Sequence, residues 1–261
     1  METKSIIYKN FSNKKKLLNK KKLTNLVNFK ILFQKYPLLK SLTNNYSYSY
    51  KKKDLKNLKK YTEFNLVGMG GSILGAQAIY DFLEHKIKKK FFFFNNLQNF
   101  KILKSKRKRL NIVISKSGNT LETVSNLNQI LTKQKKNNNL IITENKKNIL
   151  RLIANKIRSD IIDHKNYIGG RYSVLSEVGM VPAELMGLNE KKFKRLNYLI
   201  KNKSFMNYLI HNVSSIHSNV TRGKKNSVIL NYDEKLNNFL KWYQQLSAES
   251  LGKKGKGFFP I

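Results

Sequence analysis

The chain has 261 residues, of which 40% are apolar, no cysteine and a formal net charge of +37. This length allows one large domain or two small ones with a sizeable core. The lack of cysteine excludes disulfides and thiolate metal sites, and no apolar run reaches the roughly 18 residues of a transmembrane helix. The first 22 residues contain no apolar stretch typical of a secretory signal. We therefore expect no membrane association and a cytoplasmic location.

The charge comes from 52 lysines and arginines against 15 aspartates and glutamates. Basic surfaces bind nucleic acid by releasing counterions, so a polyanion partner is one hypothesis. However, lysine is spread along the whole chain together with much asparagine, isoleucine, phenylalanine and tyrosine, which is typical of coding drift in an AT-rich genome. No nucleic-acid-binding motif accompanies the charge. We expect no nucleic-acid partner, although a diffuse positive field would attract small phosphorylated molecules.

Short apolar segments alternate with helical patterns from about residue 61 onward. The N-terminal 57 residues are basic, with a candidate helix at 23–33 and a polar loop at 44–50. We then expect strands at 64–67, 91–94, 110–114, 140–143 and 161–162, and helices at 73–84, 120–133 and 148–157. This alternation is typical of βαβ units. It predicts an α/β fold of three layers, a parallel sheet with helices on both faces.

The C-terminal third predicts the start of a second α/β unit. A helical stretch containing Pro182 follows Ser173, and a basic linker lies around 191–203. A strand at 228–230 and a helix at 236–250 come next. A parallel sheet left this bare would be poorly covered, so we expect the chain to be incomplete or completed by a partner. The predicted divisions are a basic, partly helical segment at 1–57, a first domain at 58–187, and linker helices with the start of a second domain at 188–261.

The segment Ser115-Lys-Ser-Gly-Asn-Thr-Leu-Glu-Thr123 runs from a predicted strand into a predicted helix. The backbone N–H groups at a helix N-terminus carry the positive end of the helix dipole, which favours an anion. Hydroxyls at Ser115, Ser117, Thr120 and Thr123 add neutral donors. An ordinary N-cap with a capping box explains the same pattern. The residues alone leave phosphate binding and helix capping as alternatives.

The segment Gly68-Met-Gly-Gly-Ser72 follows the first predicted strand. A dinucleotide-binding motif would need glycine at position 73, where this chain has isoleucine, and the Gly-Lys-Ser/Thr ending of a P-loop is missing. Neither NAD nor ATP is supported, and we expect no cofactor. Glycines let a ligand approach the backbone closely. Because parallel sheets bind ligands at the carboxyl ends of their strands, this segment and residues 115–123 indicate one site.

The predicted helix at 236–250 places its apolar residues on one stripe, at Leu236, Phe239, Leu240, Tyr243 and Leu246. Gln245 and Glu249 lie roughly opposite and four residues apart, which makes them neighbours on one face. A carboxylate beside an amide, facing away from the core, suits proton transfer on a polar ligand. A solvated helix face explains the same spacing, and spacing alone favours it.

Four segments in this order resemble the phosphoglucose isomerase family. They are VGMGGSILG at 67–75, SKSGNTLET at 115–123, GGRYS at 169–173 and WYQQLSAESLGK at 242–253. The resemblance covers roughly residues 60–260. It implies a sugar isomerase (SIS) domain at 58–187 and the beginning of a second at 188–261. It also implies an enzyme of glycolysis and gluconeogenesis that interconverts glucose 6-phosphate and fructose 6-phosphate without a metal or cofactor.

The resemblance implies roles for ten residues. Glu249 matches the base that moves a proton between C2 and C1 through a cis-enediol. Arg171 matches the cation that stabilises the negative charge developing there. The implied substrate and phosphate contacts are Gly71, Ser72, Ser115, Lys116, Ser117, Thr120, Thr123 and Gln245. Ser117 stands where a threonine is usual, which keeps the hydroxyl.

Part of the family pattern is missing from this sequence. The family also uses a histidine and a lysine from motifs beyond the Gly/Lys-rich loop, and the sequence ends before either. The histidines present lie outside the family motifs, at positions His85, His164, His211 and His217. We therefore expect the N-terminal portion of an isomerase that is a homodimer when full length. A non-catalytic sugar-phosphate-binding module is the alternative, although such a module should lack the AESLGK segment.

Overall fold

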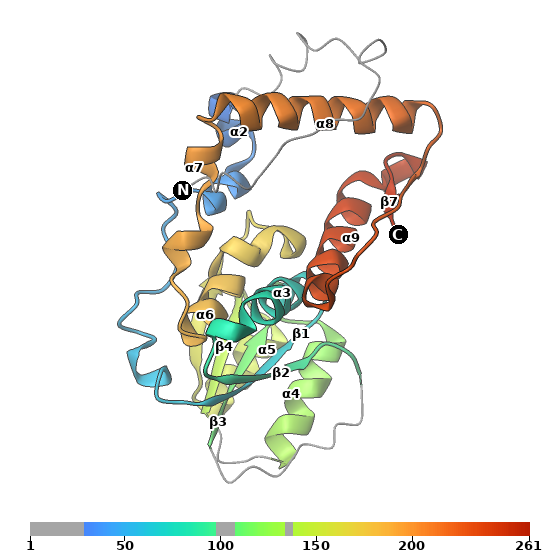
Figure 1. Cartoon of the computed structure of the whole chain (residues 1–261). Coiled ribbons are helices and arrows are strands. Elements are labelled where there is room, and N and C mark those ends of the chain that lie inside the picture. The colour runs from blue at the N-terminus through green and yellow to red at the C-terminus, as the bar shows by residue number, and fades with distance from the viewer. Residues whose placement is uncertain (1–28, 98–107, 134–137) are drawn as a thin grey trace.

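The computed structural model describes residues 29–97, 108–133 and 138–261. Five parallel strands form one sheet in the order β2-β1-β3-β4-β5. They are β1 (Glu63–Gly68), β2 (Lys90–Phe94), β3 (Arg109–Ile114), β4 (Asn138–Glu144) and β5 (Asp160–His164). Figure 1 shows this sheet in the lower half of the molecule. Each strand covers a segment expected from the sequence, so the predicted parallel sheet is confirmed.

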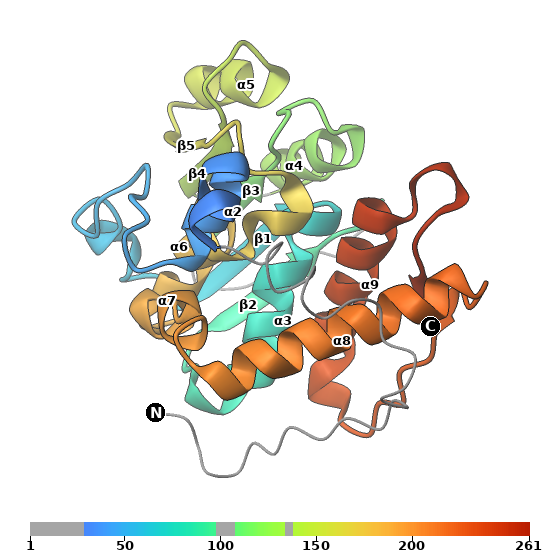
Figure 2. The ribbon, with the colours of Figure 1, turned by 90° about the horizontal axis from the view of Figure 1, so that it is seen from above.

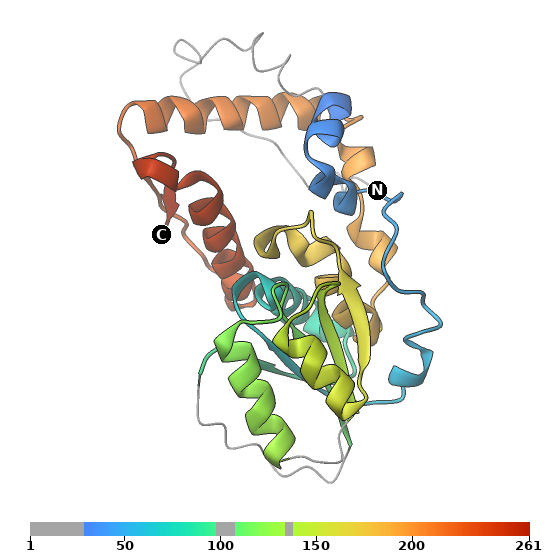
Figure 3. The same ribbon diagram turned by 180° about the vertical axis from the view of Figure 1, so that it is seen from behind.

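Helices cover both faces of the sheet. One face is covered by α3 (Leu74–Leu83) and α6 (Glu177–Leu185), and the other by α4 (Leu121–Lys133) and α5 (Ile149–Ile157). Side chains of a strand point alternately to the two faces. Ile112 and Ile114 of β3 accordingly join the cluster under α3 and α6, whereas Val113 joins the cluster under α4 and α5. The predicted three-layer α/β fold is therefore confirmed, and Figure 3 shows the α4–α5 layer from its outer side.

A ladder of asparagine side chains fixes the register of three strands. Asn65 Nδ2 donates to Asn111 Oδ1 at 2.7 Å, and Asn111 Nδ2 donates to Asn139 Oδ1 at 2.8 Å. The parallel register places these three residues directly opposite one another on β1, β3 and β4. A slip of one residue would turn every side chain to the other face and break the ladder. The carboxyl ends of β1 and β3 are thereby held level.

The N-terminal arm packs against α6. A short helix α2 (Phe29–Lys35) covers the end of the helix expected at 23–33, and the rest of that prediction lies outside the described residues. The loop expected at 44–50 is present. It was predicted to be polar, and this is wrong for two of its tyrosines, which are buried. Tyr46 and Tyr50 are buried, and their hydroxyls donate to Glu177 at 3.0 Å and Glu184 at 2.8 Å. Tyrosine fits here because its ring fills the core while its hydroxyl satisfies a buried carboxylate.

Helices also occupy most of the C-terminal part. The region expected as a basic linker contains α7 (Leu196–Leu199) and leads into α8 (Lys203–Thr221), which runs across the top of the molecule in Figure 1 and obliquely across the lower half of Figure 2. Helix α9 (Asn237–Leu251) packs on α3, as the helix expected at 236–250. In the described part of the chain, none of the helices has the length and apolar character that crossing a bilayer requires.

The strand expected at 228–230 is wrong. The structure instead has a two-residue strand β6 (Asn226–Ser227), which pairs in parallel with β7 (Phe259–Pro260). Val228 and Leu230 are 69% and 73% exposed. Apolar side chains stabilise a strand when neighbouring strands and a covering layer bury them. The described residues provide no such cover for Val228 and Leu230, so the apolar run stays irregular.

Candidate active site

The loops that follow β1 and β3 lie side by side at the carboxyl edge of the sheet. The register pairs Gly68 at the end of β1 with Ile114 at the end of β3. The glycine loop (68–72) and the serine loop (115–120) therefore start at neighbouring positions. The strand order reverses between β1 and β3, because β2 lies on one side of β1 and β3, β4 and β5 on the other. Such a switch point leaves a crevice where α/β proteins bind ligands.

The serine loop brings three hydroxyls together. Ser115 Oγ lies 2.8 Å from Thr120 Oγ1, and Ser117 Oγ lies 3.4 Å from the same atom. The backbone N–H groups of Gly118 and Asn119 donate to Ser115 Oγ and Ser117 Oγ, each at 3.2 Å. Helix α4 starts directly after Thr120. Hydroxyl donors thus converge beside a helix N-terminus, an arrangement that suits a phosphate group.

Glycine is required at position 118 for two reasons. Its φ of +68° lies in the left-handed region, and a Cβ there would lie 2.1 Å from Asn148 Oδ1. Asn148 is the N-cap of α5 and accepts a hydrogen bond from Arg151 N at 2.9 Å. Asn119 Oδ1 accepts another from Ile149 N at 3.0 Å. The serine loop is therefore pressed against the start of α5 and held in one conformation.

Two predicted phosphate contacts, one on this loop and one in the first turn of α4, do not offer their side chains to the hydroxyl cluster. Lys116 Nζ lies 3.3 Å from Glu144 Oε1 and donates to Asn166 O at 2.7 Å. Burial of the Glu144 carboxyl opposes its ionisation, but hydrogen bonds from Lys146 and Lys116 outweigh that effect and hold its pKa below the ordinary value. Thr123 is 1% exposed, and its hydroxyl has no hydrogen-bond partner among the described residues. For both side chains, phosphate contact stays a prediction and needs a change from this conformation.

The glycine loop packs tightly against two other segments. A Cβ on Gly71 would lie 2.4 Å from Gly170 C and 2.5 Å from Arg171 N, in the 3₁₀ segment η6 (Gly170–Leu175). Gly70 has a φ of +52°, and a Cβ there would lie 2.7 Å from Gln245 Nε2 on α9. Side chains at these positions would separate the three segments. The glycines therefore let the glycine loop, η6 and α9 meet.

Arg171 and Glu249 form an ion pair at this meeting point. Arg171 Nη1 lies 3.1 Å from Glu249 Oε2, and Gln245 Nε2 donates to Glu249 Oε1 at 2.8 Å. The side chain of Arg171 is 23% exposed and that of Glu249 is 49% exposed, so a ligand can reach both. Within the described part of the chain, no group accepts a hydrogen bond from Arg171 Nη2. A carboxylate and a guanidinium with unused donors thus lie side by side and are open to a ligand.

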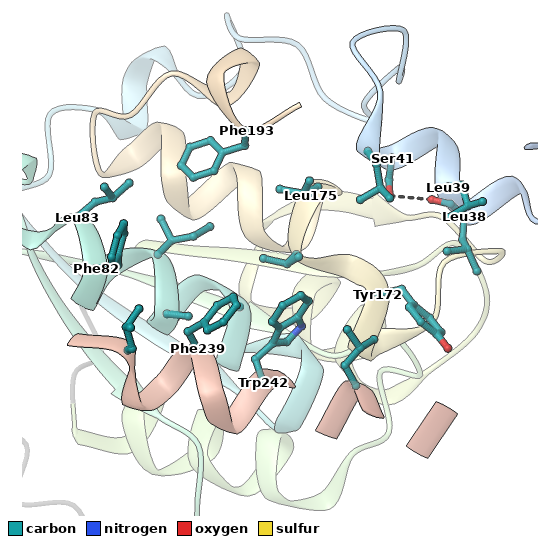
Figure 4. A pocket seen from close by; sticks show the side chains of 17 residues that line it. Leu38, Leu39, Ser41, Phe82, Leu83, Tyr172, Leu175, Phe193, Phe239 and Trp242 are labelled. Carbon is teal, nitrogen blue, oxygen red and sulfur yellow. Dashed lines mark hydrogen bonds between the residues drawn. The ribbon is translucent and has the colours of Figure 1, made fainter. Parts of the chain in front are cut away.

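Helix α9 separates a polar cleft from an apolar cavity. The polar cleft has a volume of about 550 Å³ and is lined by Gly70, Gln245 and Glu249 together with Asn95, Asn96 and Lys241, to which the sequence assigned no role. The apolar cavity has a volume of about 670 Å³, and Figure 4 shows Phe82, Tyr172, Phe239 and Trp242 around it. A charged ligand would be poorly solvated in the apolar cavity. The polar cleft therefore suits a polar ligand better than the apolar cavity does, although the serine-loop hydroxyls are not among its lining residues.

The apolar stripe predicted on α9 is confirmed in part. Leu236, Phe239 and Leu246 line the apolar cavity, whereas Leu240 and Tyr243 are not among its lining residues. Gln245 and Glu249 line the polar cleft, as expected from their position opposite the stripe. The structure thus puts the two predicted polar residues on a ligand-accessible face.

Sequence reasoning missed the residues that hold Arg171 in place. Arg171 Nε donates to Ser250 Oγ at 2.9 Å, and Tyr172 Oη lies 2.5 Å from the same oxygen. Trp242 Nε1 donates to Arg171 O at 3.1 Å. All three residues lie in segments that the sequence singled out. Their position beside Arg171 comes from the packing of α9 on η6, for which the sequence gives no local signal.

The described ranges, with their gaps at 98–107 and 134–137, contain no group of three His, Cys, Asp or Glu side chains suited to hold a metal ion. The polar groups that the candidate site offers are the carboxylate of Glu249, the guanidinium of Arg171 and the amide of Gln245, and, at the end of β3, the hydroxyls of the serine loop. This set can bind an anion, move a proton and stabilise a developing negative charge.

Two solved structures share this architecture. A hypothetical protein from Thermus thermophilus aligns with a TM-score of 0.70 and 21% identity, over 93% of this chain and 62% of that one. A tagatose-6-phosphate ketose/aldose isomerase from Escherichia coli aligns with a TM-score of 0.54 and 15% identity, over 92% of this chain and 63% of that one. The fold is therefore that of the sugar isomerase domains.

The family can be stated more narrowly from sequence. A family model for phosphoglucose isomerase matches residues 38–256. A glucose-6-phosphate isomerase from Methanocaldococcus jannaschii is 34% identical in an alignment of 229 residues that covers 79% of this chain and 56% of that protein. One from Clostridium tetani is 28% identical in an alignment of 240 residues that covers 80% of this chain and 53% of that protein. The chain belongs to the phosphoglucose isomerase family, and it spans about half the length of these relatives.

Proposed function

We propose that this chain catalyses the reversible isomerisation of glucose 6-phosphate and fructose 6-phosphate. The observation that carries the proposal is the carboxylate of Glu249, held between the guanidinium of Arg171 and the amide of Gln245 at the switch point of the sheet. The names of the relatives support the choice of substrate, since both are called glucose-6-phosphate isomerase.

In the proposed mechanism, Glu249 removes the proton on C2 of the open-chain aldose. The electrons of the C2–H bond form the C1=C2 double bond of a cis-enediol, and the C1 carbonyl oxygen takes the π electrons and a proton from water to become a hydroxyl. Arg171 Nη2 faces the negative charge that develops on these oxygens. The protonated Glu249 then delivers its proton to C1 while the hydroxyl on C2 gives its proton to water and becomes the carbonyl. The hydrogen bond from Gln245 keeps the carboxylate oriented through both transfers.

The serine loop is proposed to bind the phosphate of the substrate. Ser115, Ser117 and Thr120 supply hydroxyls beside the N-terminus of α4. Gly71 and Ser72 lie in the adjacent glycine loop, and we propose that they contact the sugar. Lys116 and Thr123 complete the phosphate contacts after the side-chain changes described above.

We further propose the division into a basic, partly helical segment (1–57), a sugar isomerase domain (58–187), and linker helices with the start of a second such domain (188–261). The packing of α9 on α3 supports a site to which both parts contribute. A homodimer and a cytoplasmic role in glycolysis and gluconeogenesis complete the proposal. Neither a membrane nor a nucleic acid is proposed as a partner.

The test is a comparison of three forms of the chain. Wild type, Glu249→Gln and the control Glu234→Gln, whose carboxyl is exposed in the turn before α9, are assayed with fructose 6-phosphate by NMR in D₂O. Exchange of the C1 and C2 protons reports proton transfer directly. We expect Glu249→Gln to lower turnover by about three orders of magnitude, in the range for loss of a general base, with the dissociation constant for glucose 6-phosphate little changed.

Two outcomes would contradict the proposal in different ways. Near-normal turnover by Glu249→Gln would remove Glu249 from the role of base. Binding of glucose 6-phosphate without proton exchange by the wild-type chain would favour the second candidate, a non-catalytic sugar-phosphate-binding module. That candidate is favoured by the serine loop, whose hydroxyls are suited to bind phosphate without any chemistry on the sugar.

A further inference from the structure

Ser250 is shared by two consecutive residues of η6. Arg171 Nε donates to Ser250 Oγ at 2.9 Å, and Tyr172 Oη lies 2.5 Å from the same atom. A guanidinium can only donate, so Ser250 Oγ is the acceptor in the first contact. The second lone pair or the hydroxyl proton of Ser250 serves Tyr172. One side chain of α9 thus binds both the arginine and the neighbouring tyrosine.

The residue next to Ser250 makes the other polar contact of the guanidinium. Arg171 Nη1 lies 3.1 Å from Glu249 Oε2. The guanidinium is a rigid planar group, so two contacts, at Nε and at Nη1, determine its orientation. Nη2 keeps its donors for a ligand, since the described residues accept no hydrogen bond from it. The direction of Nη2 therefore depends on both Ser250 and Glu249.

The remaining contacts of Arg171 hold other parts of the residue. Trp242 Nε1 donates to the backbone carbonyl oxygen of Arg171 at 3.1 Å. The guanidinium carbon lies 4.8 Å from the centre of the Tyr172 ring, which lines the apolar cavity shown in Figure 4. Neither contact fixes the rotation of the guanidinium about its own bonds. Ser250 provides the hydrogen bond that does so without involving the base.

We propose that Ser250 is a positioning residue for the reaction, because it aims Arg171 Nη2 at the charge that develops on the substrate. The proposal rests on the proposed function and deepens the role of Arg171 there. Without the Ser250 hydroxyl, Arg171 keeps only its pair with Glu249, whose side chain is 49% exposed. A single contact to an exposed carboxylate holds a side chain weakly. The guanidinium can then rotate about that contact. In other orientations it would still pair with the Glu249 carboxylate but would no longer direct Nη2 at the substrate.

The first measurement reads the position of Arg171 without any activity. The Nε–H signal of Arg171 is assigned in a ¹H–¹⁵N spectrum by its loss in Arg171→Lys, and its exchange with solvent is measured. We expect exchange about tenfold faster in Ser250→Ala, because a hydrogen bond to a charged group is lost. Ser250→Thr keeps the hydroxyl and should stay within about twofold of wild type. Ser204→Ala, at an exposed serine in the first turn of α8, is the matched control.

The second measurement is the kinetics of glucose 6-phosphate isomerisation by the same variants. We expect Ser250→Ala to lower kcat about tenfold with KM nearly unchanged, since the contact acts on charge present in the transition state. Ser250→Thr should restore most of kcat. An Nε–H exchange rate in Ser250→Ala equal to that of wild type would overturn the positioning role, as would a raised KM with unchanged kcat. If the wild-type chain turns over no sugar phosphate, the proposed function fails, and the exchange rate still decides whether Ser250 orients Arg171.

Discussion

The serine loop and helix α9 carry the two parts of the proposed site, yet they are held in place differently. The serine loop continues β3, whose six residues are all buried. Helix α9 has 15 residues, of which only Ser247 is buried. Burial of a large apolar side chain contributes about 1.5–3 kcal/mol, whereas one hydrogen bond contributes about 1 kcal/mol net. The serine loop is thus positioned by the core, whereas α9 packs on α3 through partly buried side chains and adds polar contacts to Arg171 and Tyr172.

Because the core and the contact between α9 and η6 are held differently, substitutions in the two regions should affect different properties. A substitution in the core should change the free energy of unfolding and leave the site intact in the molecules that stay folded. A substitution where α9 meets η6 should leave the core intact and change binding or turnover. The four predictions below test this separation.

The largest effect is expected from Ile112→Ala in β3. Ile112 is 0% exposed, and its truncation leaves a cavity between the sheet and α3. We expect the free energy of unfolding to fall by about 2–5 kcal/mol in urea titrations, with the affinity of the folded fraction for glucose 6-phosphate unchanged. The control Ile216→Ala, at a residue of α8 that is 39% exposed, should cost much less. An equal loss of unfolding free energy in Ile112→Ala and Ile216→Ala would show that burial does not determine the cost of truncation.

Gly71→Ala should separate the glycine loop from η6, which carries Arg171. The new methyl group would lie 2.4 Å from Gly170 C, so backbone must move. A displacement of about 1 Å at a catalytic site can cost roughly 100-fold, and we expect a loss of this size in kcat/KM, with urea stability reduced less than in Ile112→Ala. Gly170→Ala is the matched control, because a Cβ on Gly170 would meet no atom within 4 Å. Similar kinetics for both variants would refute the steric explanation.

Lys194 lies over the rings of Tyr46 and Tyr48, away from α9, and its titration should be visible in the free energy of unfolding. It is 3% exposed, and burial lowers its pKa from 10.5 to about 8 despite the attraction of Glu177 and Glu190. Between these two values the folded chain holds fewer protons than the unfolded chain, so the free energy of unfolding rises with pH. We expect a rise of about 1 kcal/mol between pH 7.5 and pH 9. Lys194→Met should abolish this rise, and an unchanged slope in that variant would assign it to another group.

The smallest effect is expected from Trp242→Phe. The variant keeps an aromatic ring at the apolar cavity but loses the hydrogen bond from Nε1 to Arg171 O. We expect kcat to fall about three- to tenfold, as for the loss of one neutral hydrogen bond, with no measurable change in urea stability. Tyr243→Phe, at the next position of α9, serves as control. A stability loss without a kinetic effect would mean that Trp242 only packs.

Secondary structure was predicted correctly for strands that are covered by helices on both faces. Residues 110–114 form a continuous apolar run because β3 is covered on both sides, and the strand is present as expected. Residues 228–230 have the same appearance but stay irregular, since apolar character does not reveal whether a covering layer exists. The prediction for Tyr46 and Tyr50 was wrong in the opposite direction, because these residues were expected in a polar loop and are buried. Their polar neighbours indicated a surface loop, while the buried carboxylates that they satisfy lie more than 120 residues away.

The same contrast holds within the site. The serine loop is a local feature, and its strand-to-helix position with clustered hydroxyls is recognisable from residues 115–123. The direction of the Lys116 side chain was not recognisable, because its partner Glu144 comes from the end of the next strand. Four motifs singled out Arg171 and Glu249, but their contact across 78 residues of chain depends on how α9 packs.

The sequence by itself determined the parallel sheet, the two loops at the end of its strands and the choice of Arg171, Gln245 and Glu249 as candidates. These are consequences of local spacing, apolar runs and motifs. The tertiary structure alone decided that Ser250, Tyr172 and Trp242 hold Arg171, that the arm tyrosines satisfy buried carboxylates, and that α9 divides a polar cleft from an apolar cavity. The physical reason is that hydrogen bonds and packing act between side chains close in space, whereas a motif records only those close in sequence.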